Sequence, residues 1–174
     1  MLSRRNIRIK VFQAYYAFLT SGNTAEDVFK QLLEDDYKSL KMSAPSAAQP
    51  DTAADAQFLS ELFLGTIRKA PDYEALILAT LQNWDINRVA TVDRIILMLA
   101  LHEMISFADV PVKVSLNEYL DIAKQFSTDK SSQFVNGVLD AVYQKLKQEN
   151  QIHKSGRGLV DPASGPGNTL KRTV

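Results

Sequence analysis

The feature that most constrains the fold is the stretch over residues 91–107, which is apolar on nearly every face of a helix. Its apolar members are Val92, Ile95, Ile96, Leu97, Met98, Leu99, Ala100, Leu101, Met104, Ile105 and Phe107. Such a helix is stable only when other elements surround it, so we expect it at the centre of the molecule. Its start at Asp93 and Arg94 is expected to be exposed. Its end at His102 and Glu103 is expected to be at least half exposed.

Six further stretches carry apolar side chains at spacings of three and four, which is typical of helices with one buried face. They run over about residues 3–20, 24–40, 52–68, 71–83, 112–126 and 130–148. No stretch shows the sustained alternation, bounded by Asn-Gly or Asp-Gly turns, that predicts a β hairpin. The sequence therefore predicts an all-α fold of about seven helices in one compact domain over 1–149. A disordered tail is expected over 150–174, because apolar periodicity ends there.

Two residues in these stretches disfavour a helix. Pro71 would suit the first turn of a helix, so we expect the chain to break at Ala70–Pro71–Asp72. Gly137 lies inside the last helix, where glycine costs about 1 kcal/mol relative to alanine. This cost predicts that another segment approaches the backbone closely at Gly137.

The composition excludes several classes of function. The chain has 174 residues and no cysteine, so disulfides and thiolate metal sites are impossible. It lacks an apolar run of the ~20 residues that a membrane helix needs, and its start does not resemble a secretory signal. We expect a cytoplasmic protein with no membrane contact.

Catalytic signatures are missing as well. The sequence has no GxxxxGK[ST] loop, no GxSxG and no strand–GxGxxG–helix pattern. His102 and Glu103 are adjacent in the chain, and adjacent helical residues point in different directions. We predict that the protein is not an enzyme and has no catalytic residues, no metal site and no cofactor.

The charges are unevenly distributed although 20 basic and 20 acidic residues cancel. Arg4, Arg5, Arg8 and Lys10 lie in the first ten residues, and no acidic residue precedes Glu26. Cations at a helix start are disfavoured by the helix dipole, so their presence calls for a reason. Contact with a polyanion such as RNA is one interpretation, and a solvated start with mobile side chains is the other.

Three segments point to a known family: RRNIRIKVFQAYYA at the start, NWDINRVATVDRIILMLALHEM in the middle, and KVSLNEYLDIAKQFS followed by FVNGVLD near the end. Together they resemble the NusB family of bacterial transcription antitermination factors. The resemblance implies two packed helical sub-bundles and binding of the boxA element of ribosomal RNA leader transcripts. It also implies two protein partners, namely NusE (a small-subunit ribosomal protein) and the antitermination complex on RNA polymerase.

The resemblance also implies which residues carry these functions. The candidate RNA-binding residues are Arg4, Arg5, Arg8, Lys130, Gln133 and Phe134. The candidate contacts to NusE are Tyr16 and Asp93. Core packing is an equally good interpretation of Phe134 and of Tyr16, and Asp93 could simply favour the helix dipole.

The sequence departs from the common family pattern at two positions. Lys130 stands where relatives often carry an acid, so RNA affinity or its regulation is expected to differ, and His102 stands where a tyrosine is often found. Two alternative functions remain open. One is an RNA-binding helical domain like that preceding the catalytic part of ribosomal RNA cytosine methyltransferases, and the other is a protein-binding helical scaffold.

Overall fold

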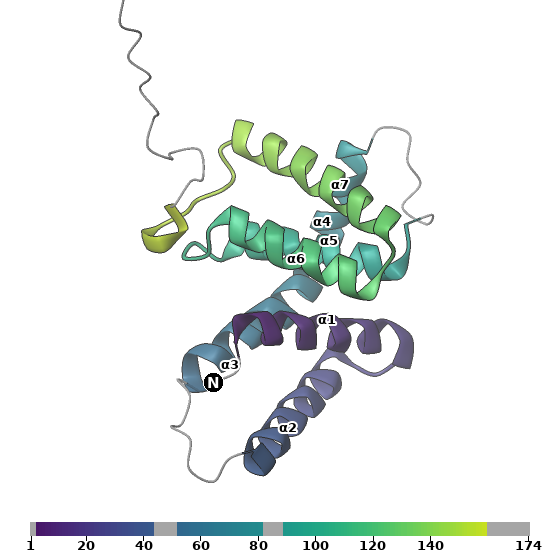
Figure 1. Cartoon of the computed structure of the whole chain (residues 1–174), viewed down its shortest axis with the longest axis vertical. Coiled ribbons are helices and arrows are strands. Elements are labelled where there is room, and N and C mark those ends of the chain that lie inside the picture. The colour runs from purple at the N-terminus through teal and green to yellow at the C-terminus, as the bar shows by residue number, and fades with distance from the viewer. Residues whose placement is uncertain (1–2, 44–51, 82–88, 160–174) are drawn as a thin grey trace, which may run out of the picture.

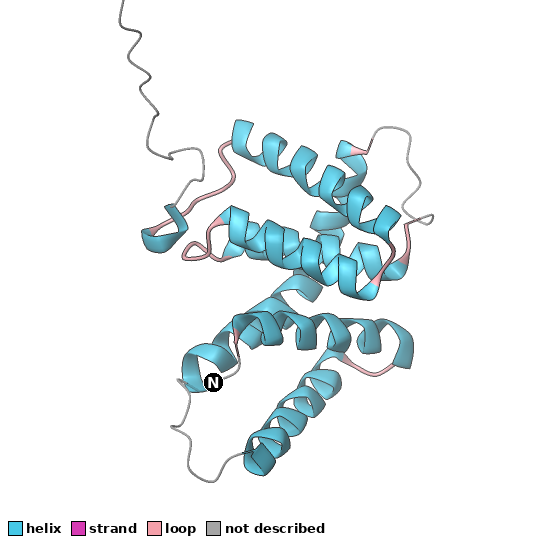
Figure 2. Cartoon of the chain, viewed as in Figure 1, coloured by secondary structure: helices cyan, strands magenta, loops and turns pink. Residues whose placement is uncertain are grey.

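The computed structural model describes residues 3–43, 52–81 and 89–159, and every regular element in these ranges is a helix (Figure 2). The elements, in chain order, are α1 (Arg4–Ser21), α2 (Ala25–Ser43), α3 (Thr52–Ser60), the π-helical turn η1 (Glu61–Gly65), α4 (Thr66–Thr80), α5 (Thr91–Ser106), α6 (Val112–Phe126), α7 (Asp129–Gln148) and the 3-10 turn η3 (Gly156–Leu159). The predicted all-α fold is confirmed.

The helices form two groups (Figure 1). In one group α1 packs against α2, α3 and η1; in the other α4, α6 and α7 surround α5. Contacts of α1 and η1 with α5 join the groups. The central position predicted for residues 91–107 is confirmed, because seven consecutive residues of α5, Ile95–Leu101, are buried. The two packed sub-bundles implied by the resemblance are present.

The end of α5 differs from the prediction of an exposed or half-exposed terminus. His102 and Glu103 are both buried, at 2% and 0% exposure. Each finds polar partners inside the protein, which is the condition for burying such groups at tolerable cost. A single sequence shows which side chains are polar but not which partners meet them.

The break predicted at Pro71 is wrong, because Pro71 lies inside α4. A proline in a helix interior removes one backbone hydrogen bond. Here Tyr73 and Ile77, which follow the proline, are buried in the core. Their packing stabilises the helix past Pro71. The irregularity lies earlier, at η1, where a π turn joins α3 to α4.

The folded region also continues beyond the boundary predicted at residue 149. The Lys154 ammonium donates a 2.8 Å hydrogen bond to the carbonyl of Phe107, and the Ser155 amide donates to the carbonyl of Ala108 at 2.9 Å. These bonds hold the start of the predicted tail against the α5–α6 connection. The remainder of that tail, 160–174, lies outside the described residues.

Candidate nucleic-acid interface

The start of α1 presents two arginines to solvent. Ser3 caps this helix, its hydroxyl accepting a hydrogen bond from the Asn6 amide at 3.2 Å. The side chains of Arg4 and Arg5 are 44% and 46% exposed. Two of the three predicted RNA-binding arginines are therefore accessible to a phosphate.

Arg8, the third predicted RNA contact, is only 3% exposed. Its guanidinium donates to both carboxylate oxygens of Glu103, at 2.8 Å each. Burial alone would lower the pKa of Arg8, but the hydrogen bond and charge of Glu103 outweigh it and raise that pKa. We therefore correct the assignment of Arg8: it joins α1 to α5 and is not available to RNA in this structure.

The Glu103 carboxylate also accepts hydrogen bonds from two hydroxyls of α6. Ser115 donates to one oxygen at 2.8 Å and Tyr119 donates to the other at 3.1 Å. Burial, followed by the charge of Glu103, raises the pKa of Tyr119 well above its ordinary value, so its hydroxyl keeps its proton and donates. The buried network fixes α1, α5 and α6 relative to one another, and so positions the start of α1.

The exposed arginines are themselves paired with carboxylates. Arg4 lies 3.2 Å from Asp109, and its guanidinium also sits over the Phe58 ring, 4.6 Å from the centroid. Arg5 lies 3.1 Å from Asp121 and 3.9 Å from Glu118. An incoming phosphate must compete with these groups.

The start of α7 provides the second predicted RNA-binding cluster. The Thr128 hydroxyl caps the helix by accepting a hydrogen bond from the Ser131 amide at 3.1 Å. Lys130 and Gln133 are exposed. Phe134 is half-buried and packs against the core, so its ring combines a core contact with an exposed part.

The end of α6, which precedes the second cluster in the chain, packs on the helix that carries the first. Phe12 of α1 packs on Phe126 of α6, with ring centroids 5.0 Å apart. Phe126 is the last residue of α6, and α7 begins three residues later at Asp129. The end of α6 thus packs on the middle of α1, and the start of α7 follows it in the chain.

The two predicted partner residues lie in contrasting environments. Tyr16 is 44% exposed, which removes the core interpretation and leaves its ring accessible. Asp93 is only 4% exposed and accepts a 2.9 Å hydrogen bond from the Ser127 hydroxyl. The exposed position expected for Asp93 is wrong, because this bond ties the start of α5 to the α6–α7 turn.

His102 is a buried structural residue and not the exposed or half-exposed one that the sequence predicted. The Nε2 of His102 lies 3.0 Å from the carbonyl oxygen of Glu61, which can only accept, so this nitrogen carries the proton. Nδ1 then accepts from the Tyr73 hydroxyl at 2.8 Å. Burial lowers the pKa of His102.

The ring of His102 lies where a Cβ on Gly65 would be, with its Cε1 only 2.7 Å from that position. Close packing therefore requires glycine at position 65, and not at position 137 as the sequence predicted.

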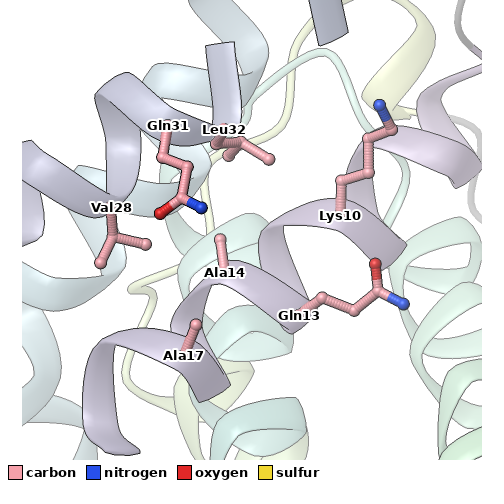
Figure 3. A pocket seen from close by; sticks show the side chains of 7 residues that line it. All are labelled: Lys10, Gln13, Ala14, Ala17, Val28, Gln31 and Leu32. Atoms are coloured by element: carbon pink, nitrogen blue, oxygen red, sulfur yellow. The ribbon is translucent and has the colours of Figure 1, made fainter. Parts of the chain in front are cut away.

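A groove of about 290 Å³ lies between α1 and α2 (Figure 3). Ala14, Ala17 and Val28 form an apolar part, and the longer side chains of Gln13 and Gln31 come from the two helices. On α1 the groove residues occupy a different face from Arg5 and Phe12, which contact α6. The groove is therefore separate from the proposed RNA-binding residues.

Two further features of the described residues concern metal sites and membrane spans. Within the described ranges, no group of three or more His, Asp or Glu side chains could hold a metal ion. Among the same residues, no helix is long and apolar enough to cross a membrane.

Comparison with known proteins gives consistent sequence matches. The pattern of the NusB family matches residues 5–144. Transcription antitermination protein NusB of Chloroherpeton thalassium is 38% identical over 161 residues, covering 92% of this chain and 71% of the relative. The protein of the same name from Salinibacter ruber is 34% identical over 160 residues, covering 92% of each chain.

Solved structures have the same fold. NusB of T. maritima superimposes with a TM-score of 0.67 at 26% identity, covering 84% of this chain and 97% of that one. A structure described as antitermination factors NusB and NusE in complex with dsRNA gives a TM-score of 0.66 at 22% identity, covering 82% of this chain and 96% of that one.

Proposed function

This chain belongs to the NusB family of transcription antitermination proteins, and we propose that it binds boxA-type RNA of ribosomal RNA leader transcripts together with NusE. The observation that carries the proposal is the pair of exposed arginines at the first turn of α1, held in place by the buried Arg8–Glu103 pair beneath them. The complex would then join the antitermination assembly on RNA polymerase.

The proposed RNA surface consists of Arg4, Arg5, Lys130, Gln133 and Phe134. Single-stranded RNA is bound by phosphate contacts together with stacking of bases on aromatic rings. Arg4, Arg5 and Lys130 supply the cations, and the exposed amide of Gln133 can form hydrogen bonds with a base or the backbone. The half-buried ring of Phe134 supplies a stacking surface if its exposed part meets a base.

The proposed NusE contact centres on Tyr16. An exposed tyrosine offers a large apolar surface and a hydroxyl, a combination that is enriched at protein interfaces. Leu19, one helical turn further along α1, is also exposed and extends the apolar surface. Asp93, the second residue that the resemblance assigns to this contact, is buried and accepts a hydrogen bond from Ser127, so the proposal rests on Tyr16.

The proposal is tested by fluorescence anisotropy of a labelled boxA RNA titrated with the protein alone and with NusE, beside a scrambled RNA at two salt concentrations. We expect tighter binding to boxA than to the scrambled RNA, and a further gain when NusE is present. Equal, weak binding to both RNAs that is indifferent to NusE would contradict the proposal. Tyr16→Ala should remove the gain from NusE while leaving the binding of RNA alone unchanged.

A further inference from the structure

The two exposed arginines that α1 contributes to the proposed RNA surface each pair with a nearby carboxylate. Arg4 pairs with Asp109, and Arg5 pairs with Asp121 and Glu118. Asp121 also lies 3.6 Å from Lys124, on the next turn of α6. Its single carboxylate therefore bridges two cations, one from each helix.

These outer pairs differ physically from the buried pair beneath them. The side chains of Arg5 and Asp121 are 46% and 42% exposed, and exposed ion pairs are worth only ~0–1 kcal/mol. Arg8 and Glu103 are almost completely buried and joined by two 2.8 Å bonds, so separating them would leave the buried Glu103 carboxylate without its cation. Only in the outer pairs can the arginine readily exchange its carboxylate for another anion.

We propose that Asp121 is an internal competitor of RNA phosphate for Arg5, and that it thereby sets the RNA affinity of this surface. The inference rests on the proposed function. A guanidinium uses the same N–H groups to bind a carboxylate or a phosphate, so the Arg5 Nη2–Asp121 contact must be released or shared when a phosphate arrives. Competition of this kind weakens binding to any RNA, and selects for RNAs that make further contacts elsewhere on the surface.

The test compares Asp121→Asn with Asp72→Asn in the full chain. Asp72 is a matched control, because it is an exposed acid that pairs with a lysine three residues away, Lys69 on α4, and its loss changes net charge equally. Labelled boxA and scrambled single-stranded RNAs are titrated by anisotropy at low salt. We expect Asp121→Asn to bind both RNAs about two- to fivefold more tightly than the wild type, which is the range of an exposed ion pair. Asp72→Asn should bind like the wild type.

A second comparison assigns the gain to Arg5. In an Arg5→Ala background, the increase in RNA affinity caused by Asp121→Asn should be less than half of that in the wild-type background. The remaining increase would come from Lys124. Suppose that the wild type binds RNA and that Arg5→Ala weakens this binding. If the Asp121→Asn variant then binds RNA no more tightly than the Asp72→Asn variant, this inference is overturned and the proposed function is not. An undiminished gain in the Arg5→Ala background would also overturn it. If the wild type binds neither RNA, the proposed function fails and this inference fails with it.

Discussion

Arg8 and Glu103 form a buried bidentate ion pair that joins the first turns of α1 to the end of α5, with both N–O distances at 2.8 Å. The pair links two residues 95 positions apart in sequence. It converts an arginine from a basic cluster into part of the core, and leaves its neighbours Arg4 and Arg5 facing solvent.

Removing one member of this pair should destabilise the protein strongly. Glu103→Gln removes the carboxylate that is hydrogen-bonded to the buried guanidinium and leaves only Glu118, 3.7 Å away, so we expect the free energy of unfolding to fall by about 3–5 kcal/mol. Urea denaturation followed by circular dichroism measures the change. Replacing both Arg8 and Glu103 by methionine should cost less than the sum of the two single changes, because no charge is then left buried. Strict additivity would show that the two side chains are not coupled.

Stability should fall in mildly acidic solution because of His102. Its folded-state pKa lies below the ordinary value of 6.5. Below pH 6.5, His102 is therefore protonated to a greater extent in the unfolded chain than in the folded protein. The free energy of unfolding then decreases as pH falls, by at most about 1.4 kcal/mol per pH unit. Denaturation at a series of pH values between 5 and 7.5 tests this. Histidine is the side chain whose ordinary pKa lies in that range. His102→Gln should flatten the profile, and an equally steep profile in that variant would assign the effect to other groups.

Two glycines should respond to alanine in opposite ways. A Cβ on Gly137 would meet nothing within 4 Å, so Gly137→Ala should stabilise the protein by about 1 kcal/mol through helix propensity alone. A Cβ on Gly65 would overlap the His102 ring, which is hydrogen-bonded through both nitrogens, so Gly65→Ala should destabilise by about 1–3 kcal/mol. Thermal unfolding of both variants measures the difference. The same sign for both would contradict the packing described around His102.

The exposed arginines should account for part of the salt dependence of RNA binding. Replacing Arg4 and Arg5 together by alanine should lower the slope of log affinity against log salt by ~0.7 for each lost phosphate contact on single-stranded RNA. Lys69→Ala is a suitable control, because Lys69 is an exposed cation on α4. An unchanged slope in the double variant would remove the start of α1 from the RNA surface.

Phe134 should contribute to RNA binding through its ring rather than its bulk. Phe134→Leu retains apolar volume, so the free energy of unfolding should change by less than about 1.5 kcal/mol, while loss of base stacking should weaken RNA binding by ~1–3 kcal/mol. Anisotropy and urea denaturation of the same preparation separate the two effects. If binding is unchanged and only stability falls, the ring serves the core.

Much of the fold could be read from the sequence because it depends on local patterns. The apolar run over 91–107 requires a central helix, and Ser3 and Thr24 cap α1 and α2 through bonds to the amides of Asn6 and Asp27, three residues on. Among the predicted RNA-binding residues, some owe their accessibility to their position in a helix. Lys130 and Gln133, for example, lie on the exposed face at the start of α7.

What the sequence could not decide was which distant groups meet. The charge of Arg8 looks the same in sequence as that of Arg4 and Arg5, and only its position on the inner face of α1, opposite Glu103, makes it a core residue. His102 is likewise buried because Tyr73 and the carbonyl of Glu61 satisfy its two nitrogens, and Gly65 leaves room for its ring. Local propensity and periodicity are properties of neighbouring residues, whereas the cost of burying a charge or a polar group depends on partners that only the tertiary structure brings into contact.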